Sequence, residues 1–448
     1  MRPSSSIRPV LGLLLFAATV SAWRLFPVPP SSDSFYKVPS LISLYPPGSI
    51  INYRDVPSAI GAFGVKTNLA SAHQILYRTN DGDGKATATV LTVLIPPNAD
   101  FGAVLSVVMA EDAVSIDCAP SYGMLLESEI FSRTNSATAQ LQLLLIEAAM
   151  AQGWVVIVPD FEGPQASFLD SKLAGQATLD GIRAALKSGW FTGIRRDAAL
   201  TLWGYSGGAS AALVAASMRP TYASELDISG VALGGLSSPN LSLSIFAEIN
   251  KGPHAGLIPM SLTAVGKADA TFQASLDKHL LASAKNKFYL PRTQCLDANL
   301  ASFNNVDVLG MFDCWDCVKT DLVTALSKHK EATYVPRSGS TFIYHCLHDE
   351  LTPIAEIDKE VQEFCQEGAI VHYQRDLGPN VNHRNYGVLG APHAIEWLRG
   401  IYNSSERETV CSNEAVTSVD LPDWFLDAYP STIRNALVKL IAGDIGAG

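Results

Sequence analysis

The sequence lacks blocks of positive charge and has few charged residues of either sign. Lysine and arginine number 32 against 43 aspartates and glutamates, so the formal net charge is −11 at pH 7, and charged residues make up only 17% of the chain. Proteins that bind nucleic acid or anionic membranes need basic surfaces, and this composition argues against both classes. The 48% hydrophobic content excludes a mainly disordered chain.

The apolar stretch near the N-terminus is too short to span a bilayer comfortably. It runs from Val10 to Val20, follows Arg2 and Arg8, and leads to the small residue Ala22. This pattern is typical of a secretory signal peptide. We therefore expect residues 1–22 to be removed after Ala22 and the mature protein to be secreted (extracellular). An uncleaved anchor or a buried N-terminal helix is the alternative.

A secreted chain can carry glycans and disulfides. Asn240 and Asn403 each open an Asn-x-Ser sequon and are candidate N-glycosylation sites in a eukaryotic secretory pathway. The cysteine count is odd, so disulfides are expected with one thiol left unpaired. Spacing alone leaves the pairing of the seven cysteines open: Cys118, Cys295, Cys314, Cys317, Cys346, Cys365 and Cys411.

Signals for a bound metal are missing. Cys314 and Cys317 have C-x-x-C spacing, but no second pair completes a zinc ribbon, so a local disulfide or two free thiols is favoured. The Asp-Gly pairs at residues 81–84 lack the closing glutamate of a calcium loop, and a turn is expected there. The sequence predicts no metal and no organic cofactor.

Apolar strands alternate with helices through most of the chain. Continuous apolar strands separated by helices predict a mostly parallel α/β sheet covered on both faces, with the chemistry at the carboxyl ends of the strands. A hairpin, 73–77 with 86–95, comes first. The expected strands that follow are 103–109, 154–158, 198–203, 228–233, 341–345 and 369–373, and the expected helices between and after them are 137–152, 176–188, 209–218 and 391–402.

From residue 240 to about 330 this alternation stops, and the pattern becomes mostly helical, as at 271–284 and 319–329. We interpret residues 240–334 as a helical cap inserted between a first core part, 23–239, and a second core part, 335–448. Four apolar cap positions either line an acyl tunnel or pack the core of the cap: Phe246, Ile249, Ile258 and Leu262. The segment from Cys411 onward is either an ordered flap or a docked C-terminal helix.

The most informative motif is Gly204-Tyr205-Ser206-Gly207-Gly208, which lies between an expected strand and an expected helix. This is the layout of a nucleophile elbow, in which a serine is held on a strained turn. Side chains at Gly204 and Gly208 would collide with neighbouring backbone, and the free N–H of Gly207 would favour a developing oxyanion. A tight glycine turn without chemistry is the alternative.

A serine nucleophile needs a base and an acid that orients the base, in the chain order serine, acid, histidine. Asp349 directly follows an expected strand and is favoured as the acid over Glu350, which is expected to point elsewhere. Two histidines follow. His383 lies in an expected loop, whereas His393 opens a helix after a proline, so position favours His383 without deciding between them.

From about Asp33 to the C-terminus, the chain resembles the fungal secretory lipases, the lipase A-like branch of the α/β-hydrolases. The elbow contributes to the resemblance, and the other motifs that carry it, in order, are residues 77–79, 111–112, 117–122, 158–164, 179–184, 390–392 and 397–398. The resemblance implies an α/β-hydrolase fold with an inserted helical cap.

The resemblance also implies roles for single residues. It implies Ser206 as nucleophile, Asp349 as acid and His383 as base, with an oxyanion hole formed by the backbone N–H groups of Asp112 and Gly207. It further implies disulfides between Cys118 and Cys295 and between Cys365 and Cys411. The sequence departs from the family at Cys346, where glycine is more usual, and Cys346 is our candidate for the unpaired thiol.

These features together predict a secreted serine ester hydrolase (lipase/esterase), and the resemblance implies acylglycerol substrates and transient contact with a lipid interface. The alternative within the same chemistry is an esterase, deacetylase or acyltransferase that acts on one small metabolite. A binding protein that kept the fold without catalysis would be expected to have lost part of the serine, histidine and acid set, and all three are present.

Overall fold

The computed structural model describes residues 26–130, 137–237, 243–328, 334–403, 408–418 and 420–441. The expected signal peptide and Asn240 lie outside the described residues. Asn403 is the exposed last residue of helix α14. In the described part of the chain, no helix combines the length and apolar character needed to cross a membrane.

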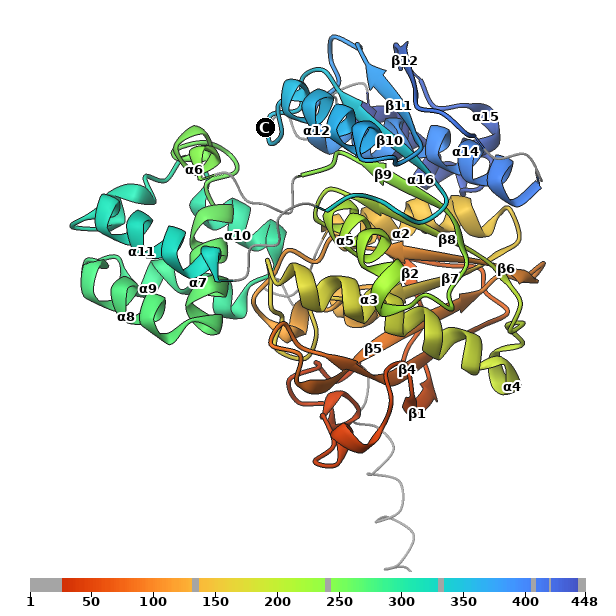
Figure 1. Cartoon of the computed structure of the whole chain (residues 1–448), viewed down its shortest axis with the longest axis horizontal. Helices are drawn as coiled ribbons and strands as arrows, with labels where there is room; N and C mark the ends of the chain where they lie inside the picture. The colour runs from red at the N-terminus through yellow and green to blue at the C-terminus, as the bar shows by residue number, and fades with distance from the viewer. Residues whose placement is uncertain are drawn as a thin grey trace, which may run out of the picture.

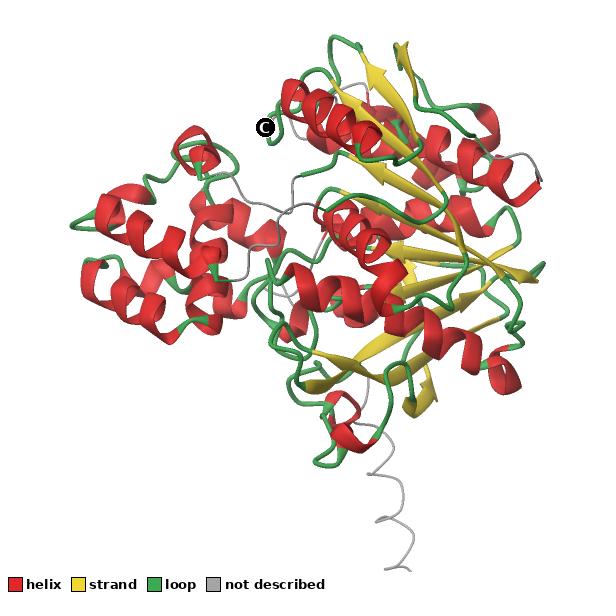
Figure 2. Cartoon of the chain, viewed as in Figure 1, coloured by secondary structure: helices red, strands yellow, loops and turns green. Residues whose placement is uncertain are grey.

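Within the described ranges, the core is a ten-stranded sheet in the order β1-β4-β5-β7-β6-β8-β9-β10-β11-β12 (Figure 2). β1, β4, β5 and β7 pair antiparallel, and all pairs from β7 to β12 are parallel. The strands are β1 Ile50–Asp55, β4 Ser71–Asn80, β5 Ala86–Ile95, β6 Asp100–Val108, β7 Trp154–Pro159, β8 Ala199–Tyr205, β9 Ile228–Gly234, β10 Ser340–Cys346, β11 Val371–Asp376 and β12 Ser412–Val416, with a separate pair β2 Gly61–Ala62 and β3 Val65–Lys66.

Helices cover both faces of this sheet, as expected for strands such as β7, in which every residue is buried. One hydrophobic core lies under α3 Ser171–Lys187, α5 Gly207–Tyr222 and α12 Ile354–Gln366. The core on the other face lies under α2 Ala137–Met150, α13 His383–Leu389, α14 Ala391–Asn403, α15 Asp423–Leu426 and α16 Ser431–Ile441. The short helices α1 Pro120–Gly123 and α4 Gly189–Thr192 lie in connections.

Two outer strands were not expected from the sequence. β1 and β12 form the two edges of the sheet, and most of their residues are exposed or only half-buried. They therefore lack the continuous apolar pattern that identified the central strands. The segment after Cys411 supplies edge strand β12 before its helices pack on the core, so it is neither a flap nor only a docked helix.

A helical insertion, which we define as α6 to α11, lies between β9 and β10 in sequence and stands apart from the sheet at the left of Figure 1. It has its own hydrophobic core, in which Ile258 and Leu262 are fully buried. Its helices are α6 Ser244–Ile249, α7 Leu257–Ala268, α8 Ala270–His279, α9 Lys285–Phe288, α10 Leu296–Phe303 and α11 Trp315–Ser327. The domain boundaries at residues 239 and 334 stay a prediction.

Three disulfides are present in the described residues. Cys118–Cys295 joins the segment after β6 to the start of α10 in the helical insertion, and its partners are 177 residues apart in the sequence. Cys365–Cys411 joins α12 to the residue before β12, and Cys314–Cys317 closes a local turn. Cys346, at the end of β10, is a buried free thiol.

Loss of the Cys118–Cys295 bond should destabilise the protein more than loss of Cys314–Cys317. A disulfide that closes a long loop restricts the unfolded chain more, and the two separations are 177 and 3 residues. We expect Cys118→Ser/Cys295→Ser to lower the free energy of unfolding by about 2–4 kcal/mol. Denaturant titration of both double variants measures this, and equal losses would contradict the expectation.

Candidate active site

The nucleophile elbow lies where β8 passes into α5, at the carboxyl edge of the sheet. Ser206 has φ 55° and ψ −126°, a strained backbone that non-glycine residues rarely adopt. A Cβ at Gly204 would lie 2.3 Å from the carbonyl oxygen of Gly208, and one at Gly208 would lie 1.9 Å from that of Val108. Only glycine fits at both positions, which confirms the steric requirement predicted from the motif.

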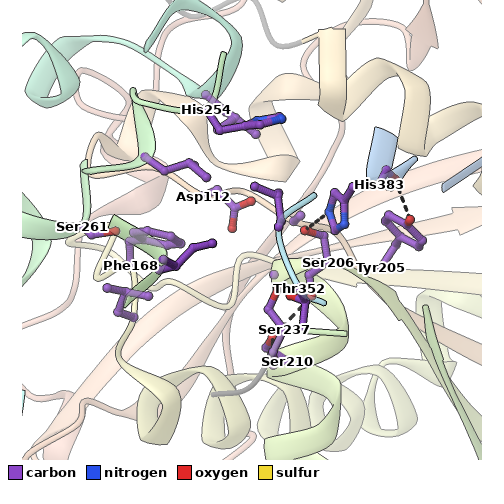
Figure 3. A pocket seen from close by; sticks show the side chains of 18 of the residues that line it. Asp112, Phe168, Tyr205, Ser206, Ser210, Ser237, His254, Ser261, Thr352 and His383 are labelled. Atoms are coloured by element: carbon purple, nitrogen blue, oxygen red, sulfur yellow. Dashed lines mark hydrogen bonds between the residues drawn. The ribbon is translucent and has the colours of Figure 1, made fainter. Parts of the chain in front are cut away.

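Ser206 contacts the histidine favoured by the sequence analysis. Its Oγ lies 2.8 Å from Nε2 of His383 (Figure 3). Nδ1 of His383 in turn lies 2.7 Å from Oδ2 of Asp349. The geometry thus brings together a hydroxyl, an imidazole and a carboxylate in a continuous hydrogen-bonded chain. His393 is elsewhere, in α14, with Nε2 3.3 Å from Oγ of Ser418.

The local fold around the histidine differs from the expected loop. His383 is the first residue of the short helix α13, whose capping box is formed by Asn382 and Asn385. The loop after β11 ends just before it, so the imidazole is held by a helix start rather than by a free loop. The sequence Asn-His-Arg-Asn contained both capping residues, but the helix is too short for periodicity to reveal.

The carboxylate of Asp349 is buried, and both of its oxygens accept hydrogen bonds. Its Oδ1 accepts hydrogen bonds from the N–H groups of Leu351 and Thr352, both at 2.9 Å. Burial acts to raise the pKa of Asp349, but the hydrogen bond and positive charge from His383 hold that pKa below its ordinary value. The carboxylate therefore stays ionised and can stabilise a charged imidazole.

The pKa of the His383 imidazole is shifted in the opposite direction to that of Asp349. Burial acts to lower its pKa, but the hydrogen bond and charge of Asp349 outweigh burial and raise that pKa above the ordinary value. A base with this pKa accepts a proton readily near neutral pH. This polarity suits proton transfer from a hydroxyl such as that of Ser206.

Asp112 lies next to the first residue of helix α5. Its backbone is in the left-handed region, with φ 43°, and its carboxyl covers Gly207 so closely that a Cβ there would lie 2.2 Å from Oδ1 of Asp112. Figure 3 shows this side chain facing the cavity, on the same side as Ser206. Burial raises the pKa of Asp112 to about 6, and the charge of His383 opposes this shift.

Two further carboxyl groups, which have no role predicted from the sequence, are buried in or beside the Asp112 loop. Burial, followed by mutual repulsion with nearby carboxylates, raises the pKa values of Glu111 and Glu162 well above their ordinary range. Oε2 of Glu162 accepts from the N–H of Ala113 at 3.4 Å. Lys267 of α7 donates to the carbonyl oxygen of Val114 at 3.0 Å, so the helical insertion is tied to this loop.

Two other contacts to His383 were missed. Glu350 was expected to point elsewhere, and this was wrong, since its Oε2 accepts a hydrogen bond from the backbone N–H of His383 at 2.9 Å. The hydroxyl of Tyr205 donates to the carbonyl oxygen of His383 at 2.6 Å. Neither contact could be read from spacing, because both depend on where the backbone of α13 starts.

A cavity of about 1080 Å³ opens beside Ser206. Its walls are mainly apolar and come from α2, α5 and the helical insertion, so it is large enough for a long apolar chain. Phe246 and Ile249 of α6 line it and also pack in the core of the insertion, whereas Ile258 and Leu262 only pack in that core. Other apolar lining residues include Leu141, Leu145, Phe168, Leu257, Leu300 and Leu351.

Among the described side chains, no group of three or more His, Cys, Asp or Glu is arranged to hold a metal ion. The chemistry that the geometry supports is nucleophilic attack by an activated hydroxyl, because a hydroxyl, a base and an orienting acid lie in sequence at hydrogen-bond distances. An apolar cavity beside the hydroxyl suits a substrate with an apolar part.

Comparisons with known proteins show which proteins the chain resembles. Residues 128–409 match the model of the family described as "Secretory lipase". The chain is 37% identical to Lipase A of Arthroderma benhamiae over 94% of this chain and 90% of that protein, and 31% identical to Lipase 10 of Candida albicans over 99% and 96%.

Comparison with solved structures identifies the fold. The crystal structure of Candida antarctica lipase A in its closed state matches with a TM-score of 0.77 and 26% identity, over 92% of this chain and 95% of that one. The fold expected from the sequence, a mostly parallel α/β-hydrolase sheet flanked by helices, is thereby confirmed. The chain belongs to the secretory lipase family of the α/β-hydrolases and is a carboxylic ester hydrolase.

Proposed function

We propose that Ser206 is the nucleophile of this ester hydrolase, His383 its general base and acid, and Asp349 the acid that orients and stabilises the imidazole. Nε2 of His383 takes the hydroxyl proton as Oγ of Ser206 bonds to the ester carbonyl carbon. The same imidazole then protonates the departing alcohol, which leaves an acyl-serine. Water, deprotonated by His383, attacks that ester and releases the carboxylic acid and free Ser206.

The observation that carries the proposal is the pair of hydrogen bonds at 2.8 Å and 2.7 Å that connects the three side chains. The strained backbone of Ser206 adds support, because strained residues cluster at active sites.

For the oxyanion we propose the backbone N–H groups of Gly207 and Asp112. Gly207 is the first residue of α5, so its N–H has no acceptor within the helix. The carboxyl group of Asp112 packs directly against Gly207, and the backbone of Asp112 is in the left-handed region, which supports a role for this residue beside Gly207. Each donor would contribute about 3 kcal/mol to the stability of the tetrahedral intermediate.

The proposed substrates are acylglycerols, and the proposed place of action is outside the cell after cleavage near Ala22. The size and apolar lining of the cavity support an acyl chain, and the relatives named above are called lipases. We further propose transient contact with a lipid interface and a domain division of 23–239, 240–334 and 335–448.

Replacement of Ser206 by alanine tests the nucleophile and the substrate class together. We expect Ser206→Ala to lower kcat by about 10⁴-fold or more, because the variant lacks the hydroxyl group that forms the acyl intermediate. The purified mature protein and the variant are assayed on chromogenic esters from acetyl to long-chain acyl and on emulsified triacylglycerol. Activity confined to short esters would favour the metabolite esterase or acyltransferase, and equal rates would refute the assignment of Ser206.

The pH dependence of kcat/KM tests the pair of Asp349 and His383. Activity should rise with pH as His383 loses its proton, with an apparent pKa above the ordinary value because Asp349 stabilises the charged imidazole. Asp349→Asn removes that charge, so the acidic limb should move to lower pH while kcat falls by about 10⁴-fold. An unmoved limb in an active variant would contradict the assignment.

A further inference from the structure

The main chain of His383 is held from both sides by side chains. As the first residue of α13, His383 has an N–H without an acceptor in its own helix. The capping box uses the N–H groups of Asn382 and Asn385 and leaves that of His383 free for another acceptor. Oε2 of Glu350 accepts it at 2.9 Å, and the hydroxyl of Tyr205 donates to the carbonyl oxygen of His383 at 2.6 Å.

Tyr205 and Glu350 are each adjacent in sequence to a residue that is hydrogen-bonded to the His383 ring. Tyr205 precedes Ser206, and Glu350 follows Asp349. The backbone of His383 is therefore fixed relative to both Ser206 and Asp349, while Asp349 separately fixes its ring through Nδ1. A shift of the helix start would change the distance from Nε2 to Oγ of Ser206 even with the Asp349 contact intact.

Glu350 also reaches the helical insertion. Its second oxygen, Oε1, lies 3.3 Å from Nε2 of His254, which belongs to the segment between α6 and α7. His254 lines the cavity, and Figure 3 shows it across the cavity from Ser206, above Asp112. One carboxylate thus contacts both the backbone of His383 and a cavity-lining residue of the insertion.

We propose that Glu350 is a positioning residue for His383 in ester hydrolysis, and that His254 couples this carboxylate to the helical insertion. The inference rests on the proposed roles of Ser206 and His383. Burial acts to raise the pKa of Glu350, but the hydrogen bonds from His254 and from the His383 N–H lower it, so the carboxylate remains ionised. A substrate that displaces the insertion near His254 would therefore also move the base.

The test compares Glu350→Ala, Glu350→Gln, His254→Ala and the double variant Glu350→Ala/His254→Ala. Each is assayed on acetyl and octanoyl chromogenic esters, with kcat expressed per site titrated by a serine-directed phosphonate so that misfolded protein is not counted. Asp313→Asn is the matched control, since it removes the carboxylate charge of a different histidine–carboxylate pair, in which Asp313 lies 2.8 Å from His279 of the insertion, away from the cavity.

For Glu350→Ala we expect kcat to fall about 10- to 100-fold with KM changed less than about three-fold, because the base is misplaced but binding is kept. Glu350→Gln should recover most of kcat, since the amide oxygen still accepts the N–H of His383. The kcat of the double variant should fall no further than that of Glu350→Ala alone, because both substitutions remove the same contact between His254 and Glu350. Asp313→Asn should keep the wild-type kcat.

A kcat of Glu350→Ala within about three-fold of wild type would overturn the positioning role. No rescue by Glu350→Gln would overturn it as well, and additive losses in the double variant would refute the link through His254. If the wild type cleaves no ester, the proposed function fails by itself. The rate of Ser206 phosphonylation then still tests the positioning role of Glu350, because that rate depends on the contact between His383 and Ser206. An unchanged rate in Glu350→Ala would contradict the inference.

Discussion

The close approach of two backbones at Gly208 is the constraint on which the site depends. Strands β6 and β8 are parallel neighbours, with Val108 opposite Gly204, and α5 starts immediately above them. Because a Cβ at Gly208 would lie 1.9 Å from the carbonyl oxygen of Val108, helix α5 can start this close to β6 only without a side chain there. This approach brings the segment after β6 beside Gly207 and sets Ser206 on its strained turn.

The segment after β6 is joined to several other parts of the molecule. Asp112 and the buried Glu111 lie in it, Lys267 donates to the carbonyl oxygen of Val114, and Cys118 bonds it to α10. Buried carboxyl groups are costly unless they are protonated or paired, and the raised pKa values of Glu111 and Glu162 indicate that burial favours their neutral form. A nearby lysine from the insertion reduces the same cost.

The central strands could be predicted because burial on both faces leaves a continuous apolar pattern, as in β7. The elbow could be predicted because glycine is required at fixed positions around Ser206. The edge strands β1 and β12 could not, since their side chains are mostly exposed or half-buried. Glu350 and Tyr205 could not be assigned to His383 either, because their contacts are to its backbone and leave no pattern in residue type or spacing.

The separate hydrophobic core of the helical insertion has a consequence for the evolution of substrate preference. Phe246 and Ile249 line the cavity, but they pack within the insertion rather than within the cores on the two faces of the sheet. Substitutions there can reshape the space available to an acyl chain without disturbing the packing that holds the strands. The insertion can therefore change its lining to suit new esters, whereas the close approaches at Gly204 and Gly208 leave no room for a side chain in the strained serine turn.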